Sequence, residues 1–145
     1  MAILSRRAAG NREGGVDAAL LILRLVLGLL FLLHGISKLP PPPSGIVDTL
    51  VQHNLPAVLA YGTYIGEIVA PILLIVGVWT RLAALVIVIN MIFAVLLAHT
   101  GQLFSLGTSG GYALELQAMY LFTAVALALT GAGRFSVGGR YGPLN

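Results

Sequence analysis

Six polar side chains inside long apolar stretches are the residues that could do chemistry. Charged groups in a bilayer are costly, face the protein interior and mark a functional site. We therefore expect them to converge on one ligand-binding site, with no catalytic role assigned to any of them. The two cations and the two carboxylates among them sum to zero charge, as a buried set should. The candidate ligand-binding residues are Arg24, His34, Lys38, Glu67, Asn90 and Glu115.

The expected depths of these residues divide them into two layers. At about 1.5 Å per residue, Arg24, Glu67 and Asn90 lie well inside their spans, within reach of one another. The other three lie near the outer ends of their spans. The inner layer predicts contact between Arg24 and Glu67, which would either serve a ligand or lock two helices as a structural ion pair. The structural alternatives for the others are a core histidine at His34, a headgroup contact for Lys38, an interhelical bond from Asn90 and a helix N-terminal acid in Glu115.

Small and polar residues define the interior faces of the first two spans. Glu67 lies beside a ridge of small residues, Gly62, Gly66 and Ala70, which lets another helix approach closely, so its carboxylate is expected to face protein. Pro71 cannot donate to the Glu67 carbonyl and predicts a kink next to the acid. In the first span, steps of four and three residues place one stripe on a single side of the helix. The stripe consists of Arg24, Gly28, Phe31, Gly35 and Lys38.

The composition fixes the environment of these residues. Of the 145 residues, 58% are apolar and only 9% are charged, and the mean hydropathy is +0.97. A soluble surface needs roughly 25–35% charge. A soluble enzyme, a nucleic-acid-binding protein and a disordered chain are therefore excluded, and an integral membrane protein is predicted. The chain has no cysteine, which excludes thiol chemistry and cysteine-ligated iron–sulfur clusters. The sequence has no recognisable metal-ligand or haem-ligand spacing, so neither cofactor is expected.

Four apolar stretches predict an all-α membrane fold, a four-transmembrane-helix antiparallel bundle. A span needs about 20 apolar residues, and the expected spans are residues 17–39, 56–78, 82–99 and 112–130. The prolines at 40–43 end the first span. Ser44 is then expected to be the N-cap of a short amphipathic helix in the first external loop. The four-helix domain covers residues 17–136, between an N-terminal tail (1–16) and a C-terminal tail (137–145).

Basic residues predict the orientation of this bundle. An excess of Lys and Arg marks the cytoplasmic side of a membrane protein. With four spans, arginines in both tails and in the turn near residue 80 fall on one side, and only Lys38 falls on the other. Both termini are therefore expected in the cytoplasm. The arginines are Arg6, Arg7, Arg12, Arg81, Arg134 and Arg140.

The order of these motifs resembles that of the DoxX family of small four-helix bacterial membrane proteins, over roughly residues 17–136. Two stretches depart from the family pattern: Val69-Ala70-Pro71 stand where glycines often follow the second-helix acid, and Val137-Gly138 stand where an Asp is usual. The resemblance therefore assigns the fold and leaves the subfamily open. The matching motifs are Arg24-x-x-x-Gly28, His34-Gly35-x-x-Lys38-Leu39, Glu67, Gly77-x-x-Thr80-Arg81, Gly110-Gly111-x-x-x-Glu115 and Gly131-x-Gly133-Arg134-x-Ser136.

The resemblance implies a multi-pass protein of the bacterial plasma membrane that is linked to oxidoreductase systems, including quinone-dependent thiosulfate oxidation. Our first hypothesis is a redox-associated subunit that binds a quinone or another lipid-like molecule inside the bundle. Such a chain would be at most a non-catalytic or quinone-binding part of an oxidoreductase. Its electrons would come from a partner.

Two further hypotheses belong to other functional classes. One is a structural or accessory subunit of a larger membrane complex, with no chemistry of its own. The other is a lipid or sterol binder, or a small-solute permease. The expected partners are the lipid bilayer and other membrane or membrane-associated subunits, and a homo-oligomer is compatible with the sequence. Nucleic acid is not expected as a partner.

Overall fold

The described part of the chain is helical. The computed structural model describes residues 2–39, 41–108 and 110–145, and it describes side chains from Glu13 onward within those ranges. In these ranges the chain forms an isolated bridge between Leu106 and Tyr112 but no strand. The elements are α1 (Ala2–Ser37), α2 (Ser44–Gln52), the 3₁₀ helix η1 (Ala57–Tyr61), α3 (Gly62–Tyr64), the π-helix η2 (Ile65–Val69), α4 (Ala70–Val76), α5 (Thr80–Ala98), the 3₁₀ helix η3 (Thr100–Gln102) and α6 (Glu115–Thr130).

Within the described residues, three helical stretches are long and apolar enough to cross a membrane. They are Glu13–Ser37, Ala57–Val76 and Thr80–Ala98. The all-α membrane class predicted from the sequence is therefore confirmed. Helix α6 is apolar but has 16 residues, which gives a length of about 24 Å against a hydrocarbon core of about 30 Å. The fourth crossing stays a prediction.

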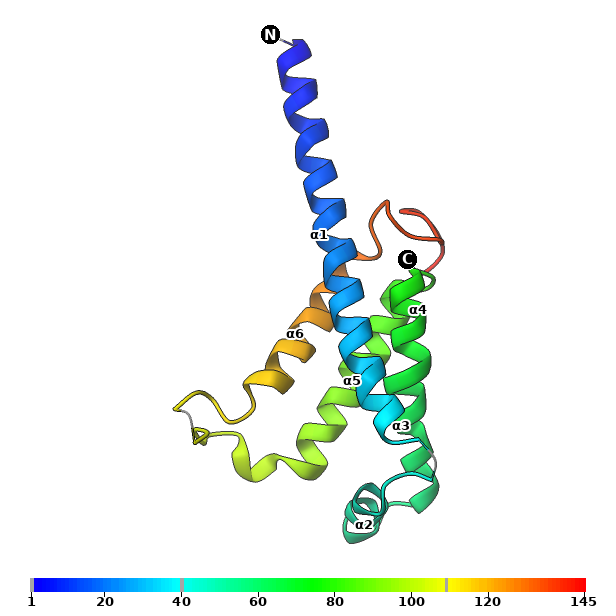
Figure 1. The fold of residues 1–145 in the computed structure, drawn as a ribbon, viewed down its shortest axis with the longest axis vertical. Helices are drawn as coiled ribbons and strands as arrows, with labels where there is room; N and C mark the ends of the chain where they lie inside the picture. The colour runs from blue at the N-terminus through cyan, green and yellow to red at the C-terminus, as the bar shows by residue number, and fades with distance from the viewer. Residues whose placement is uncertain (1, 40, 109) are drawn as a thin grey trace.

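Helix α1 begins well before the expected start of the first span. It runs from Ala2 to Ser37, and its N-terminal half projects beyond the bundle (Figure 1). Ala and Arg are strong helix formers, and each occurs three times in residues 2–16. The helix ends just before the proline run, as the sequence predicts.

The short helix α2 forms where the sequence predicts it, with a different cap. Pro43 occupies the N-cap position with φ −52° and ψ 133°, so Ser44 is the first helical residue and its expected capping role is wrong. The fixed φ of proline suits the extended backbone that precedes a helix. Leu50 is buried while Asp48 is exposed, so the helix is amphipathic as expected.

The second membrane stretch is not a uniform α-helix. It passes through η1, α3, η2 and α4 in turn. In the π-helical turn, the Ala70 N–H donates to the Ile65 carbonyl, five residues back. Pro71 follows immediately and has no N–H to offer the Glu67 carbonyl. The distortion predicted beside Glu67 is thus present, as a widened turn. Gly77, with φ 76° and ψ 48°, ends α4 in the left-handed conformation that favours glycine.

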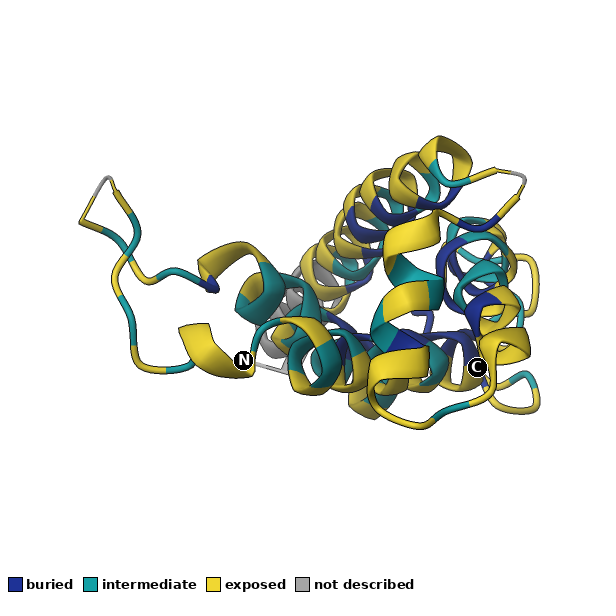
Figure 2. Ribbon diagram, turned by 90° about the horizontal axis from the view of Figure 1, so that it is seen from below, coloured by how far each residue is buried: buried dark blue, intermediate teal, exposed yellow. Residues whose placement is uncertain are grey.

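The helices pack around one apolar core. Helix α5 contacts both α4 and α6, and α1 contacts α4, η2 and α6. Exposed residues lie along the outer faces of the bundle and buried residues along the inner faces (Figure 2). The N-terminus and the C-terminal segment lie toward one end of the molecule, and α2 lies at the opposite end (Figure 1). The core consists of Leu27, Phe31, Ala70, Leu74, Ala83, Ala84, Ile87, Met91, Ala124 and Leu127.

Candidate functional site

Two glycines bring α1 against the backbone of the second membrane stretch. A Cβ added to Gly35 would overlap the Glu67 carbonyl, and one added to Gly28 would lie 2.6 Å from Ile75 Cγ1. Only glycine permits helices to approach this closely. Because the two stretches run antiparallel, this contact places Glu67 beside Gly35, one helical turn from Lys38.

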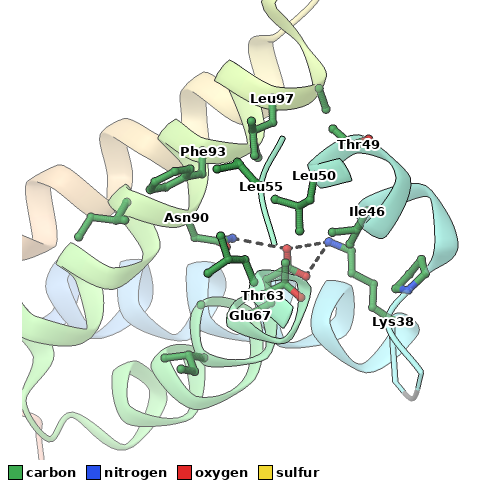
Figure 3. A pocket seen from close by; sticks show the side chains of 18 of the residues that line it. Lys38, Ile46, Thr49, Leu50, Leu55, Thr63, Glu67, Asn90, Phe93 and Leu97 are labelled. Carbon is green, nitrogen blue, oxygen red and sulfur yellow. Dashed lines mark hydrogen bonds and ion pairs between the residues drawn. The ribbon is translucent and has the colours of Figure 1, made fainter. Parts of the chain in front are cut away.

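The Glu67 carboxylate forms an ion pair with Lys38. The Lys38 Nζ lies 2.6 Å from Oε1 and 2.7 Å from Oε2, and Asn90 Nδ2 donates to Oε1 at 3.4 Å (Figure 3). The Glu67 side chain is only 8% exposed, whereas that of Lys38 is 27% exposed. The acid is therefore held inside the bundle by two donors that come from different elements.

Tyr64 fixes the backbone that carries Lys38. Its hydroxyl donates to the Lys38 carbonyl at 2.9 Å. Lys38 follows directly after the last residue of α1, where carbonyl groups lack intrahelical partners. This hydrogen bond satisfies one such carbonyl and ties α3 to the end of α1. Tyr64 therefore positions the ammonium relative to Glu67.

A cavity of about 680 Å³ opens beside the ion pair, between α2, the second membrane stretch and α5. Its walls are mostly apolar and include Leu50, Leu55, Phe93 and Leu97 (Figure 3). An apolar chamber with a few convergent polar groups is the usual form of a small-molecule site. Its polar lining residues are Lys38, Thr49, Thr63, Glu67, Asn90 and His99.

A second cavity of about 210 Å³ lies between α1, α5 and α6. It shares the Lys38–Glu67 ion pair with the larger cavity. Its wall also carries His34 and Tyr120, whose rings meet edge to face with centroids 6.1 Å apart. The remaining lining residues are Phe31, Met91, Ala94, His99, Leu116 and Gln117.

The predicted contact between Arg24 and Glu67 is wrong. The Arg24 guanidinium donates to the carbonyls of Leu74, Ile75, Ala132 and Phe135, at 2.7 to 3.2 Å. Depth estimates made separately for each helix do not fix how two helices are aligned. The glycine contacts set that alignment, and they place Arg24 near the C-terminal end of α4.

The end of the bundle that holds Arg24 is closed by the C-terminal segment. The Asn145 amide accepts from Thr80 N–H at 3.0 Å and donates to the Gly77 carbonyl at 3.2 Å. The buried Asp17 carboxylate accepts from the Arg134 backbone N–H and from the Arg140 guanidinium. This carboxylate raises the pKa of Arg140 above its ordinary value. Residues 131–145 are thus packed onto the bundle through polar contacts.

The structure places the six predicted site residues at four separate locations. Lys38, Glu67 and Asn90 meet at the larger cavity. His34 lines only the smaller one. Arg24 lies at the opposite end of the bundle, and Glu115 is exposed in the first turn of α6, where an acid suits the helix dipole.

The described side chains contain no group of three His, Asp or Glu residues arranged to hold a metal ion. The polar groups at the two cavities are an ammonium, a carboxylate, two amides, hydroxyls and imidazoles. Such groups can exchange hydrogen bonds and protons with an organic ligand. The arrangement suits the polar head of an apolar molecule.

Comparison with known proteins identifies the family. The DoxX family profile matches residues 19–100. The chain belongs to the DoxX family. A relative in Haemophilus influenzae, named "Uncharacterized protein", is 31% identical over 125 residues, covering 84% of this chain and 90% of the relative. A Bacillus subtilis protein named "Putative oxidoreductase CatD" is 28% identical over 112 residues, covering 77% of this chain and 78% of the relative. No solved structure matches this DoxX protein.

Several residues of the candidate site lie outside the six predicted from the sequence. The apolar walls of the larger cavity carry no periodicity or motif that distinguishes them from ordinary span residues. His99 is not among the six candidates, and it lines both cavities. A usable signal for Tyr64 was its place three residues before Glu67, since residues three apart share a helix face.

Proposed function

We propose that this DoxX protein binds a quinone, or a lipid-like molecule of similar shape, in the larger cavity and acts as a redox-associated membrane subunit. The observation that carries the proposal is the position of the Lys38–Glu67 ion pair in the wall of a mostly apolar chamber of about 680 Å³. Apolar walls suit an isoprenoid or acyl chain, and the ion pair with Asn90 suits a polar head.

The side chains at the chamber can serve the chemistry of a quinone head. Lys38 Nζ and Asn90 Nδ2 are donors for a quinone carbonyl oxygen. The Glu67 carboxylate is an acceptor for a quinol hydroxyl, and a carboxylate at hydrogen-bond distance can take or return its proton. Quinone reduction consumes two electrons and two protons. In this proposal a partner subunit supplies the electrons, and this chain supplies the binding site and a proton carrier. The printed name of the Bacillus subtilis relative supports a link to oxidoreduction.

The proposed orientation places both termini on the cytoplasmic side of a bacterial plasma membrane. Arg81, Arg134 and Arg140 belong to the end of the bundle where the C-terminal segment packs. Clustered arginines favour the cytoplasmic side. The Lys38–Glu67 pair and α2 would then lie toward the outer leaflet.

A structural subunit without a ligand is the second candidate function. It is favoured by the backbone contact at Gly35 and by the four carbonyl partners of Arg24, which both lock helices together. In that case, substitutions in the chamber wall would change assembly with a partner complex and leave no ligand affinity to measure.

The test compares quinone binding by matched variants of the full chain in lipid nanodiscs. Leu97 lines the chamber, whereas Leu96 is 55% exposed and does not line it. We expect decyl-ubiquinone to bind the unaltered protein saturably, and Leu97→Trp to weaken binding at least tenfold while Leu96→Trp leaves it unchanged. Glu67→Gln should also weaken binding. Absence of saturable binding, or equal affinities for the two tryptophan variants, contradicts the proposal.

A further inference from the structure

The Lys38–Glu67 ion pair is a partition between two cavities of different chemistry. Both cavities are lined by Lys38, Glu67, Ala94 and His99. The larger cavity is bounded by α2 and leads along apolar side chains of α5. The smaller one lies on the other side of the pair, against α6. Glu67 is therefore accessible from two directions, and each direction presents it to a different environment.

The smaller cavity has the size and the polar groups for water. Its volume of about 210 Å³ is several times the roughly 30 Å³ that one water molecule occupies in the liquid. A buried water needs two to four polar partners. Such partners are present from every surrounding element: His34 and Lys38 from the end of α1, Glu67 from η2, His99 at the end of α5, and Gln117 and Tyr120 from α6.

The smaller cavity also lies where helix ends meet. His34 is in the last turn of α1, His99 is the C-cap of α5, and Gln117 is in the first turn of α6. His34 is exposed and His99 is half-buried. In the proposed orientation these helix ends lie near the outer membrane surface, which places the cavity close to the aqueous phase on the α2 side.

The opposite direction along the bundle is closed to water. Leu27, Leu74, Ile87 and Leu127 are at most 2% exposed. They form the dry core between Glu67 and the end that carries Arg24. These four side chains offer no polar group that could carry a proton from the Arg24 end to Glu67.

We propose that the smaller cavity is a water-filled vestibule through which water and protons from the α2 side reach Glu67. The larger cavity takes an uncharged, lipid-soluble molecule on the other face of the same ion pair, because the pair carries no net charge to attract an ionic headgroup. Delivery of a proton to that molecule rests on the proposed function. The hydration of the vestibule does not.

The absence of cysteine from the chain makes single-cysteine variants a direct test of hydration. Gln117 lines the vestibule, and Met119, on the same helix, is 67% exposed on the outer surface of the bundle, where the predicted fourth crossing would place lipid. In nanodiscs, a charged methanethiosulfonate reagent should modify the Gln117→Cys variant at least tenfold faster than the Met119→Cys variant. Equal rates would overturn the proposal.

A second experiment follows the route to Glu67. The same reagent should modify the Glu67→Cys variant, and the added substitution Gln117→Trp should slow the reaction at least tenfold by filling the vestibule. Adding Leu97→Trp, which fills the larger cavity, should leave the rate unchanged. Slowing by Leu97→Trp alone would place the water route in the larger cavity and overturn the proposal. These rates need no quinone, so a failure of quinone binding is seen separately in the binding test.

Discussion

The Lys38 ammonium contacts both carboxylate oxygens of Glu67, at 2.6 and 2.7 Å, across 29 positions of sequence. The pair is asymmetric in burial, since the acid is almost fully enclosed and the lysine is partly exposed. A lysine stem can turn its ammonium toward headgroups or water when its partner is lost. A carboxylate enclosed by protein has no such alternative.

Removal of Lys38 should therefore destabilise the protein more than neutralisation of Glu67. Lys38→Met leaves an unpaired buried carboxylate and is expected to cost about 3 kcal/mol. Glu67→Gln keeps a hydrogen-bonding group and is expected to cost about 1 kcal/mol. Unfolding of each purified variant by sodium dodecyl sulfate measures the difference. Equal losses, or a larger loss for Glu67→Gln, would contradict the asymmetry.

Gly35→Ala should separate α1 from the second membrane stretch. The added methyl group meets the Glu67 backbone carbonyl, which cannot move as a side chain can, so we expect a loss of about 1–3 kcal/mol. Gly14→Ala is the matched control in the same helix, because nothing lies within 4 Å of its added Cβ. The control should be neutral or stabilising by up to about 1 kcal/mol. Similar unfolding curves for the two variants would show that the close contact is absent.

Arg24→Lys should destabilise the fold without weakening the binding of the proposed ligand. The guanidinium serves four backbone carbonyls, whereas a lysine offers one compact ammonium. We expect a loss of about 3 kcal/mol in the free energy of unfolding. Quinone affinity of the folded protein should stay within twofold of the unaltered value. A large loss of quinone affinity with normal stability would instead support a ligand-binding role for Arg24.

Asn145→Ala should loosen the C-terminal segment. The side chain joins Thr80, Gly77 and Gly139 through hydrogen bonds of 2.7 to 3.2 Å, and its removal leaves buried groups unsatisfied at a cost of about 1–3 kcal/mol. Tyr141→Ala is the control, because Tyr141 is 92% exposed. Limited proteolysis should cleave residues 131–145 faster in the first variant only. Equal cleavage would show that the segment is held by other contacts.

Tyr64→Phe should disturb the Lys38 position through a single hydrogen bond. Loss of the hydroxyl leaves the Lys38 carbonyl without this partner, with an expected cost of about 1 kcal/mol. Tyr61→Phe, at an exposed neighbouring tyrosine, is the control. Thermal unfolding in detergent and quinone affinity should both change for Tyr64→Phe. Equal changes in thermal unfolding and quinone affinity for the two variants would argue against the positioning role of Tyr64.

Local features of the fold could be predicted from the sequence because they depend on neighbouring residues. The stripe from Arg24 to Lys38 does face inward: Arg24, Gly28, Phe31 and Gly35 are buried. The proline run ends α1, and Pro71 accompanies the widened turn in η2. Periodicity and backbone donors determine these outcomes, and both are visible in the sequence.

The partners of the charged residues could not be predicted in the same way. Depth along a helix was estimated for each span as a straight α-helix, whereas the second stretch begins with η1 and contains η2. The long side chains of Arg24 and Lys38 also reach in directions that depth does not specify. Lys38, expected in the outer layer, is the partner of Glu67. The two cavities depend on the packing of five separate segments (α1, α2, the second membrane stretch, α5 and α6), which no local pattern encodes.

The close contact of α1 with the second membrane stretch constrains how the protein can move. Gly28 and Gly35 hold the two backbones together along seven residues of α1, and Arg24 adds bonds to Leu74 and Ile75. These contacts couple the two segments, so we expect them to move together. We therefore expect the larger cavity to open by movement of α2 and of the C-terminal half of α5, and the proposed ligand to enter between these two helices from the lipid.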